Sequence, residues 1–269
     1  MLIEARNIAL DVPDMSRVVL LGRRPKLRIL NGVSLVIARG EALGIVGESG
    51  SGKTSLGRTL LRLYRPSAGT LRFDGQDITQ ATAAEMKPLR RRMQMIFQDP
   101  QSSLNPRRSI GAILGGALTL HGLDAGPRAI SSILDRVGLP SSVTTRYPHQ
   151  LSGGQRQRVG IARAIALNPD FIVADEIVSG LDVSTQAQVL DLLKTLRAEM
   201  GLTLAFISHD LSVVRHLCER VVIMKAGSII EEGATAEVFS SPRSPFTRLL
   251  IDSIPLPEIR PGWLESSRD

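Results

Sequence analysis

Short apolar runs separated by turn residues dominate the first third of the chain. Residues 2–12 and 29–37 have the composition of strands, and the Asn-Gly pair at 31–32 is a turn signal. Residues 70–73, followed by the Asp-Gly pair at 74–75, predict a strand that ends in a hairpin turn. This part of the chain is therefore expected to be rich in β-structure.

A glycine-rich loop near residue 50 joins a predicted strand to a predicted helix. Residues 42–46 are continuously apolar, which is typical of a buried strand. A helix is expected from about Gly52, because Leu56, Leu60 and Leu63 recur at helical spacing.

The middle of the chain, residues 99–150, is predicted to be helical and to form a separate lobe. It is rich in turn residues between its apolar positions. Residues 151–166 open with two glycines and continue as a helix, since Val159, Ala162 and Ile165 share one face.

The second half alternates short apolar runs with helices. Residues 171–174 and 202–207 are typical of buried parallel strands, and the amphipathic helix between them, 184–200, should end at Gly201. This alternation predicts a mainly parallel sheet that is covered on both faces. The proline-rich tail, residues 241–269, is expected to pack as an irregular extension.

The composition predicts a large globular unit without a membrane span. A chain of 269 residues, 43% of them hydrophobic, can bury a sizeable core. The longest apolar run, residues 110–120, is about half of the roughly 20 residues that cross a bilayer, and no signal peptide is evident. A membrane role would therefore need a partner. Cys218 is the only cysteine and is expected to be a buried thiol.

Basic residues cluster in residues 17–28 and 90–92 of a chain whose net charge is +7. These clusters are either solvated faces or a surface that lies near anionic lipid or an acidic partner. Aromatic residues make up 3% of the chain, too few for a base-stacking platform, so no nucleic-acid partner is expected.

Residues 47–54, GESGSGKT, match the phosphate-binding pattern G-x-x-x-x-G-K-[ST]. The glycines let the backbone turn tightly so that successive N–H groups point at phosphate oxygens, and the following helix adds its positive dipole end. Lys53 is expected to reach the β- and γ-phosphates, and Thr54 to place its hydroxyl on Mg²⁺. The predicted nucleotide contacts in this phosphate loop and just after it are Gly47, Glu48, Ser49, Gly50, Ser51, Gly52, Lys53, Thr54 and Ser55.

Two acidic residues follow the predicted strand in FIVADE, residues 171–176. Ligands bind at the carboxyl ends of strands in open α/β sheets. Asp175 is therefore a candidate for the Mg²⁺ shell, and Glu176 a candidate for polarising the attacking water. Many strands end in an acidic residue, so this pattern is weak evidence alone. It becomes strong evidence because the chain also contains the phosphate loop.

A second glycine-rich helix start lies in LSGGQRQR, residues 151–158, called the signature segment below. One interpretation is an ordinary helix cap; the other is an anion-binding helix end. Because one phosphate cradle is already complete, a second one suggests two surfaces that meet across a dimer. The predicted contacts are Ser152, Gly153, Gly154 and Gln155.

The set and order of these motifs resemble the ATP-binding subunits of ABC transporters. Besides the three motifs above, the resemblance includes Gln98 in FQDP and His209 in ISHD. It implies an α/β fold, a RecA-like P-loop NTPase core with an N-terminal antiparallel β-subdomain and an inserted α-helical subdomain. The implied boundaries are 1–98 and 166–240 for the core with its β-subdomain, 99–165 for the helical subdomain and 241–269 for a C-terminal extension.

The resemblance also implies an ATPase with ATP and Mg²⁺ as its cofactors. Two subunits would join head to tail, so that each ATP lies between one phosphate loop and the other subunit's signature segment. Gln98 would sense Mg²⁺ and the water, His209 would contact the γ-phosphate and hold Glu176, and Asp182 would reach across the interface. The implied catalytic residues are Glu176, His209, Gln98 and Lys53, and the implied metal contacts are Thr54, Gln98 and Asp175.

Three segments narrow the resemblance to importers of dipeptides, oligopeptides or nickel. These are QDPQSSLNPR (98–107), SGLDVSTQAQVLDLL (179–193) and the tail SPFTRLLIDSIPLPE (244–258). Such importers imply two integral-membrane permease subunits, a second ATPase subunit, identical or related, and indirectly a solute-binding protein. The implied location is the cytoplasmic face of the inner membrane.

The sequence departs from the family where an aromatic residue usually stacks on adenine. No Phe, Trp or Tyr precedes Tyr64, so Val12 or Met15 would take that place. Losing an aromatic partner removes roughly 1–3 kcal/mol of stacking per base, so looser base selectivity is expected. Ile177-Val178 and Gly180 also replace the family's usual residues, without removing a catalytic group.

Three other functions share some of these motifs. ATPases of DNA repair and chromosome machines commonly insert long coiled coils before the signature segment, and residues 56–150 lack sustained heptads. A non-hydrolysing regulator would need no water-activating set such as Glu176, Gln98 and His209. Exporters usually fuse their membrane helices to the same chain.

Overall fold

A computed structural model of the chain describes residues 1–14, 25–99 and 103–253. In this part, the larger sheet has the strand order β10-β9-β3-β8-β7-β6, and every pairing except β10 with β9 is parallel. Its strands are β3 (Ala42–Gly47), β6 (Met93–Ile96), β7 (Phe171–Asp175), β8 (Thr203–Ser208), β9 (Arg220–Lys225) and β10 (Ser228–Ala234). The predicted parallel sheet is confirmed, and every residue of β3, β7 and β8 is buried because both faces are covered.

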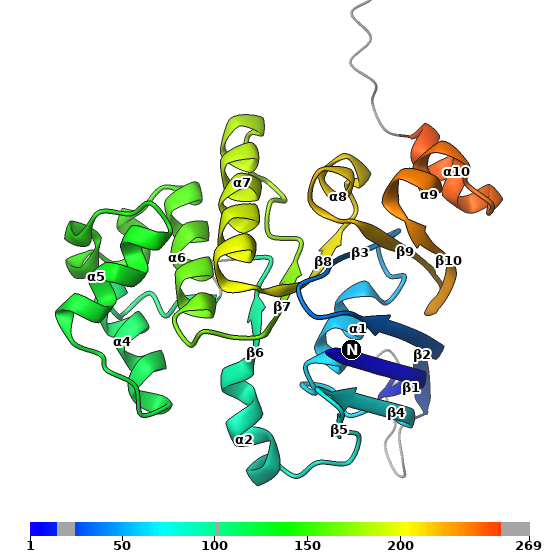
Figure 1. The fold of residues 1–269 in the computed structure, drawn as a ribbon, viewed down its shortest axis with the longest axis horizontal. Coiled ribbons are helices and arrows are strands. Elements are labelled where there is room, and N and C mark those ends of the chain that lie inside the picture. Colours follow the sequence, from blue (N-terminus) through cyan, green and yellow to red (C-terminus); the bar gives the residue numbers. More distant parts are fainter. Residues whose placement is uncertain (15–24, 100–102, 254–269) are drawn as a thin grey trace, which may run out of the picture.

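A smaller antiparallel sheet, in the order β2-β1-β4-β5, lies beside the larger one (Figure 1). Its strands are β1 (Ile3–Pro13), β2 (Lys26–Ile37), β4 (Ala68–Phe73) and β5 (Gln76–Asp77). The turn predicted at Asn31-Gly32 is wrong: both residues lie within β2, where the pairing with β1 shifts register and Gly32 takes a φ of 66°. The pair therefore forms a bulge in a continuous strand.

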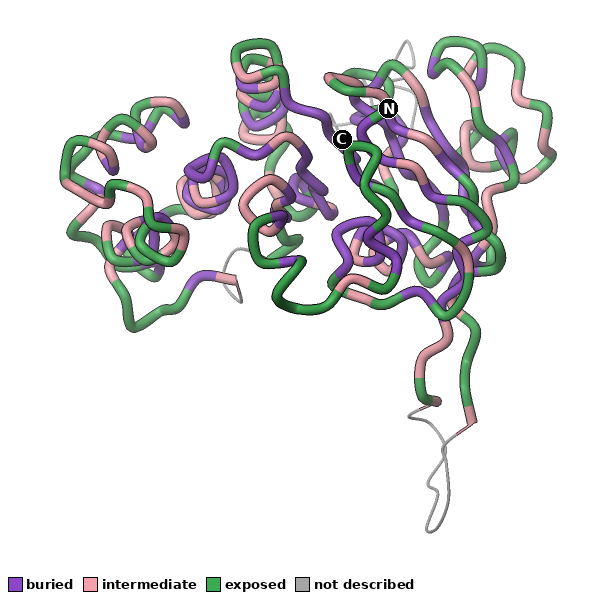
Figure 2. Tube along the Cα trace, turned by 60° about the horizontal axis from the view of Figure 1, so that its bottom comes forward, coloured by how far each residue is buried: buried purple, intermediate pink, exposed green. Residues whose placement is uncertain are grey.

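Two hydrophobic clusters cover the opposite faces of the larger sheet. One joins it to the smaller sheet and to α1 (Lys53–Leu60), whose Leu56 and Leu60 are fully buried. Leu63, expected on the same stripe, lies beyond the end of α1 and is 47% exposed. The other cluster packs under α6 (Gly153–Ile165), α7 (Val183–Met200) and α8 (Leu211–Leu217). Figure 2 shows this pattern as a buried interior with exposed outer turns.

The helices of the middle region pack on one another at one side of the molecule (Figure 1). They are α4 (Ile110–Leu120), α5 (Pro127–Arg136), the short η1 (Ser141–Thr145) and η2 (Pro148–Gln150), and the start of α6. Ser109 and Ser152 cap α4 and α6 through their hydroxyls. As predicted, α7 ends at Gly201, which has a φ of 63°.

Helix α2 (Ala83–Arg92) leads directly into β6, and the sequence patterns predicted neither element. Thr82 and Glu85 form a capping box that starts the helix, although Pro88 lies inside it. The arginine cluster at its end is not simply a solvated face: Arg90 donates to the carbonyl oxygens of Leu61 and Arg62, at 2.5 and 2.9 Å.

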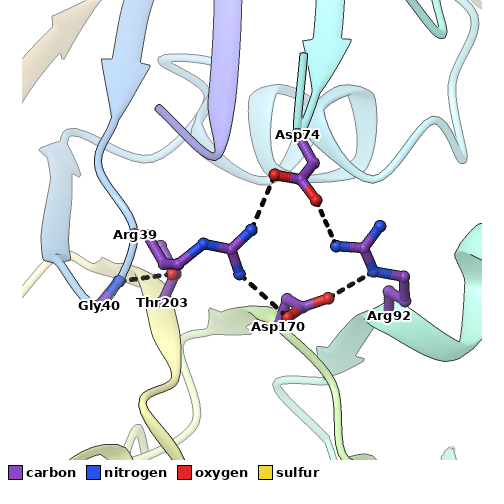
Figure 3. A network of polar contacts seen from close by, with 6 residues as sticks. All are labelled: Arg39, Gly40, Asp74, Arg92, Asp170 and Thr203. Carbon is purple, nitrogen blue, oxygen red and sulfur yellow. Dashed lines mark hydrogen bonds and ion pairs between the residues drawn. The ribbon is translucent and has the colours of Figure 1, made fainter. Parts of the chain in front are cut away.

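A ring of four alternating charges ties this region together (Figure 3). Arg39 lies 2.7 Å from Asp74 and 3.1 Å from Asp170, and Arg92 lies 2.6 and 2.5 Å from the same two carboxylates. The hydrogen bond from Arg92, followed by that from Arg39, holds the pKa of Asp74 below its ordinary value. The ring connects the β4–β5 turn of the small sheet to the start of β7. Of the other basic cluster, Arg28 pairs with Asp11 at 2.8 Å, while Arg17, Arg23 and Arg24 lie outside the described residues.

The expected irregular tail is wrong for its first part. It includes α10 (Pro245–Asp252), which follows α9 (Thr235–Ser240) and is capped by Ser244. Phe246, Leu250 and Ile251 pack against the core, which gives the helix a buried face, and Pro245 is a favourable first residue for it. Residues 254–258 of the family-like tail lie outside the described residues.

The structure bears on two expectations from composition, a buried thiol at Cys218 and the lack of a membrane span. Cys218 is buried, as predicted, and burial raises the pKa of its thiol. Among the described helices, we find none with the length and apolar character needed to traverse a bilayer.

Candidate functional site

The phosphate loop connects the end of β3 to the start of α1, as the sequence predicts. A Cβ added at Gly47 would lie 2.3 Å from the carbonyl oxygen of Met224 and 2.7 Å from Ser51 Oγ, so only glycine fits there. Ser51 Oγ is buried and has no hydrogen-bond partner within the described residues. A buried hydroxyl without a partner can donate a hydrogen bond to an oxygen atom of a ligand bound in this loop.

Lys53 is held inside this loop. Its ammonium donates to the carbonyl oxygens of Gly47 at 2.7 Å and Glu48 at 2.9 Å, and the residue is 5% exposed. Burial lowers the pKa of Lys53, while the nearby carboxylates of Glu176 and Asp175 raise it. A buried cation partly satisfied by neutral carbonyls remains available to an anion.

Thr54 of α1 contacts Asp175, the last residue of β7. The Thr54 hydroxyl donates to Asp175 Oδ1 at 2.9 Å, and Asp175 is 3% exposed. Burial raises the pKa of Asp175, and the hydrogen bond from Thr54 acts against that rise. A hydroxyl beside a carboxylate is the oxygen donor set that Mg²⁺ prefers, so these two residues fit the expected metal.

Three neighbouring strand ends bring Gln98, Glu176 and His209 together. They follow β6, β7 and β8, which are adjacent in the sheet, so Glu176 lies between the other two. Gln98 Nε2 donates to Glu176 Oε2 at 3.2 Å, and His209 Nδ1 lies 3.5 Å from the same oxygen.

Glu176 adopts an unusual backbone conformation at this point. Its φ of 47° is one that non-glycine residues seldom take, at a cost of roughly 1 kcal/mol, and its N–H donates to the carbonyl oxygen of Ile207 at 2.9 Å. Strain of this kind is typical of functional positions, and here it turns the chain sharply after Asp175.

The signature segment forms a different kind of site. Ser152 and Gln155 make a reciprocal capping box at the start of α6, with hydrogen bonds of 3.1 and 3.2 Å. Ser152, Gly153, Gly154 and Gln155 line a cavity of about 490 Å³. Within the described residues, no hydrogen bond or ion pair links these four to the phosphate loop. The cavity is also lined by none of residues 47–54, so the two motifs form separate sites on the described chain.

Other residues of this cavity carried little or no sequence signal. Arg158 donates to Gln188 and to the Val137 carbonyl, and its place at the end of LSGGQRQR was the only hint. Gln188 lies in the segment 179–193 that narrowed the resemblance, but no role was expected for it. Asp182, expected to reach across an interface, caps α7 by accepting hydrogen bonds from Ser184 and Thr185, which hold its pKa well below the ordinary value.

The chain is similar to known ATP-binding proteins in sequence. A family profile described as ABC transporter matches residues 30–179. A Brucella ovis protein, named as a candidate peptide import ATP-binding protein, is 51% identical over 239 residues, covering 88% of this chain and 75% of its own. The Bacillus subtilis protein YkfD, named as a candidate oligopeptide transport ATP-binding protein, is 45% identical over 88% of this chain and 73% of its own.

Solved structures place the fold in the same family. A dimeric ATP-binding cassette, MJ0796, in a post-hydrolysis state with ADP and Pi, matches with a TM-score of 0.76 and 29% identity over 87% of this chain and 98% of its own. The Clostridium perfringens protein cbiO1, part of the ABC transporter complex cbiONQ, matches with a TM-score of 0.75 and 26% identity over 89% of this chain and 91% of its own. On this fold, these motifs and these relatives, the chain belongs to the ABC transporter family and is one of its ATP-hydrolysing subunits.

Proposed function

We propose that this subunit powers an importer of peptides, at the cytoplasmic face of the inner membrane, together with two permease subunits. The names of the relatives support peptides as the cargo. The observation that best supports ATP hydrolysis is that Gln98 and His209 both contact the Glu176 carboxylate beside the phosphate loop. A solute-binding protein would deliver the peptide to the permeases.

The residues of the phosphate loop would bind and orient the triphosphate. Lys53 would turn from the Gly47 and Glu48 carbonyls to the β- and γ-phosphates. Its charge would stabilise the phosphates more strongly there than in water, because the site is buried. Thr54, Asp175 and Gln98 would hold Mg²⁺, which when bound supplies charge stabilisation to the transferring phosphoryl group. Ser55 and the remaining loop residues, Glu48 to Gly52, would fix the phosphates through the backbone and hydroxyl groups.

Glu176 would orient the attacking water, and Gln98 and His209 would keep its carboxylate in place. Positioning and charge stabilisation supply most of the catalysis in phosphoryl transfer. His209 would also reach the γ-phosphate, so that the same side chain reports whether the triphosphate is intact.

The signature segment would complete the site of a second ATPase subunit. Ser152, Gly153, Gly154 and Gln155 would present the start of α6 to that subunit's γ-phosphate. Shifting such a dimer from mostly open to mostly closed takes about 5 kcal/mol of differential binding. Several charge-assisted hydrogen bonds of roughly 1.5–3 kcal/mol each can provide it, and hydrolysis removes them.

A permease contact is proposed next to Gln98. A cavity of about 500 Å³ there is lined by Leu61, Leu63 and Phe97, and the Arg163 guanidinium lies over the Phe97 ring at 5.8 Å. A permease segment in this cavity would touch both the ATPase core, taken as residues 1–98 and 166–240, and the helical subdomain, taken as 99–165. Residues 241–269 would form a C-terminal extension of the oligopeptide-transporter type.

Reconstituted transport tests the proposal. The subunit, its permeases and the solute-binding protein are placed in vesicles, and uptake of labelled dipeptides, oligopeptides and Ni²⁺ is measured with and without ATP. ATP-dependent peptide uptake is expected. If only Ni²⁺ is taken up, nickel and not a peptide is the cargo. Uptake that persists with Glu176→Gln would show that this subunit does not power transport.

A further inference from the structure

A second cavity, of about 730 Å³, lies between α2, the end of α4 and the loop before β7. It is separate from the cavity beside Gln98, because no residue lines both cavities. Its lining includes Lys87, Arg91 and Arg92 from α2 and His121 after α4. This basic pocket, as it is called below, has no part in the nucleotide chemistry described above.

The positive charge of the basic pocket is only partly neutralised by carboxylates of the described chain. Within the described residues, Lys87 and His121 form no ion pair, and Arg91 donates only its Nε, to the carbonyl oxygen of Leu167 at 3.3 Å. Arg92 differs, because Asp74 and Asp170 already pair with it in the charge ring (Figure 3). Lys87, Arg91 and His121 are therefore the groups open to an anionic ligand.

An apolar side chain stands at the same place. Leu120, the last residue of α4, lines the basic pocket and is 73% exposed. A ligand that neutralises the cations and also covers Leu120 must carry a carboxylate or phosphate next to an apolar group. An acidic segment of a protein and an anionic lipid both have this chemistry.

The shape of the basic pocket favours the protein segment. Its cations line a hollow between two elements, which suits an inserted acidic side chain. The hollow also joins two parts of the molecule: α2 belongs to the core, and α4 to the group of middle helices. An occupant would therefore be linked to both.

We infer that the basic pocket receives an acidic segment of a permease subunit, whose carboxylate meets Lys87, Arg91 and His121 while an apolar neighbour covers Leu120. This inference rests on the proposed function. The loop that lines the pocket, including Asn168, runs directly into β7, and the N–H of Asp170 donates to the Arg92 carbonyl at 2.9 Å. Since β7 ends at Asp175 and Glu176 follows it, the contact lies at the opposite end of the strand that leads to the catalytic acid.

Site-specific cross-linking tests the contact. Because Cys218 is the only cysteine and is buried, a Lys87→Cys chain carries one accessible thiol for a benzophenone maleimide. In the assembled transporter, illumination is expected to yield a permease peptide that contains Asp or Glu, identified by mass spectrometry. Arg128→Cys, an exposed position on α5, is the matched control and should give little or none. Adducts with lipid only, or equal permease yields from both positions, would overturn the inference.

Charge reversal gives a second readout. Lys87→Glu is expected to weaken binding of the subunit to its permeases in nanodiscs roughly tenfold at low salt, and less in about 0.5 M sodium chloride, whereas Arg128→Glu is not. Basal ATP hydrolysis by the separate subunit should be the same in both. Equal permease binding by wild type and Lys87→Glu, or a loss seen only with phosphatidylglycerol vesicles, contradicts the inference. Absent basal hydrolysis in the wild type would contradict the proposed function instead.

Discussion

The phosphate loop and the signature segment differ in how completely this chain surrounds them. Around the phosphate loop, Lys53 and Asp175 are buried and bonded to their own subunit, and Gly47 leaves no room for a side chain. At the signature segment, Ser152 is exposed and bonds only to its own helix start. The phosphate loop is called the built pocket below. The signature segment, whose cavity includes the exposed Ser152, is called the surface motif. A reaction centre shared between two subunits would require this difference.

The largest expected effect falls on the built pocket. Glu176→Gln should slow ATP hydrolysis about 10²- to 10⁴-fold, because the amide cannot act as a base, while nucleotide binding remains. Phosphate release measures the rate, and light scattering should show a nucleotide-bound dimer that persists. Glu199→Gln, an exposed residue of α7, is the matched control and should leave the rate unchanged.

A smaller but more discriminating effect is expected at the surface motif. Ser152→Ala should slow hydrolysis about 10- to 100-fold through the loss of a hydrogen bond to a charged group, without changing nucleotide binding to the single subunit. Loss of the cap should also cost about 1 kcal/mol of unfolding free energy. Ser109→Ala removes an equivalent cap, 3.3 Å long, from α4. If both variants lose stability equally and neither loses turnover, Ser152 is only a cap.

The packing of the two motifs can be compared by adding one methyl group to each. Gly47→Ala should lower the unfolding free energy by about 1–3 kcal/mol, because its Cβ would overlap the backbone at Met224. Gly153→Ala has Leu181 as its nearest neighbour at 3.8 Å, an ordinary contact, so its unfolding curve should stay close to wild type. Urea denaturation measures both, and equal losses would remove the distinction between pocket and surface.

The smallest effect concerns the base at the edge of the built pocket. Without an aromatic partner, the dissociation constants for ATP and GTP should differ by less than about tenfold. Val12 is half-buried on β1, and Met15 lies outside the described residues. Val12→Tyr should tighten ATP binding by roughly 1–3 kcal/mol, measured by calorimetry. A strong preference for ATP in the wild type would show that another residue selects the base.

The sequence predicted the contiguous parts of the site better than the assembled ones. Lys53 and Thr54 share one motif whose backbone chemistry can be derived from its glycines. The contact of Gln98 and His209 with Glu176 depends on the order β6-β7-β8, which no local pattern contains. Only the family resemblance brought these residues together in advance.

The fold shows the same limit. Apolar runs predicted the parallel strands because continuous burial leaves a clear pattern. Helix α2 was missed because Pro88 and three successive arginines hide its short apolar face, Met86 and Leu89. The charge ring draws its members from four separate segments, so the sequence gives no sign that Arg92 pairs with Asp74 and Asp170.

Complementation between two inactive chains tests most directly whether the reaction centre is shared. Lys53→Ala and Ser152→Ala chains are each purified, shown to be nearly inactive, and mixed in equal amounts before ATP hydrolysis is measured. A mixed dimer contains one centre with both groups intact, so about a quarter of the wild-type rate should return. Two results together would contradict a shared centre. The mixture would hydrolyse ATP only at the sum of the two separate rates, and the wild-type rate per chain would persist on dilution to monomers.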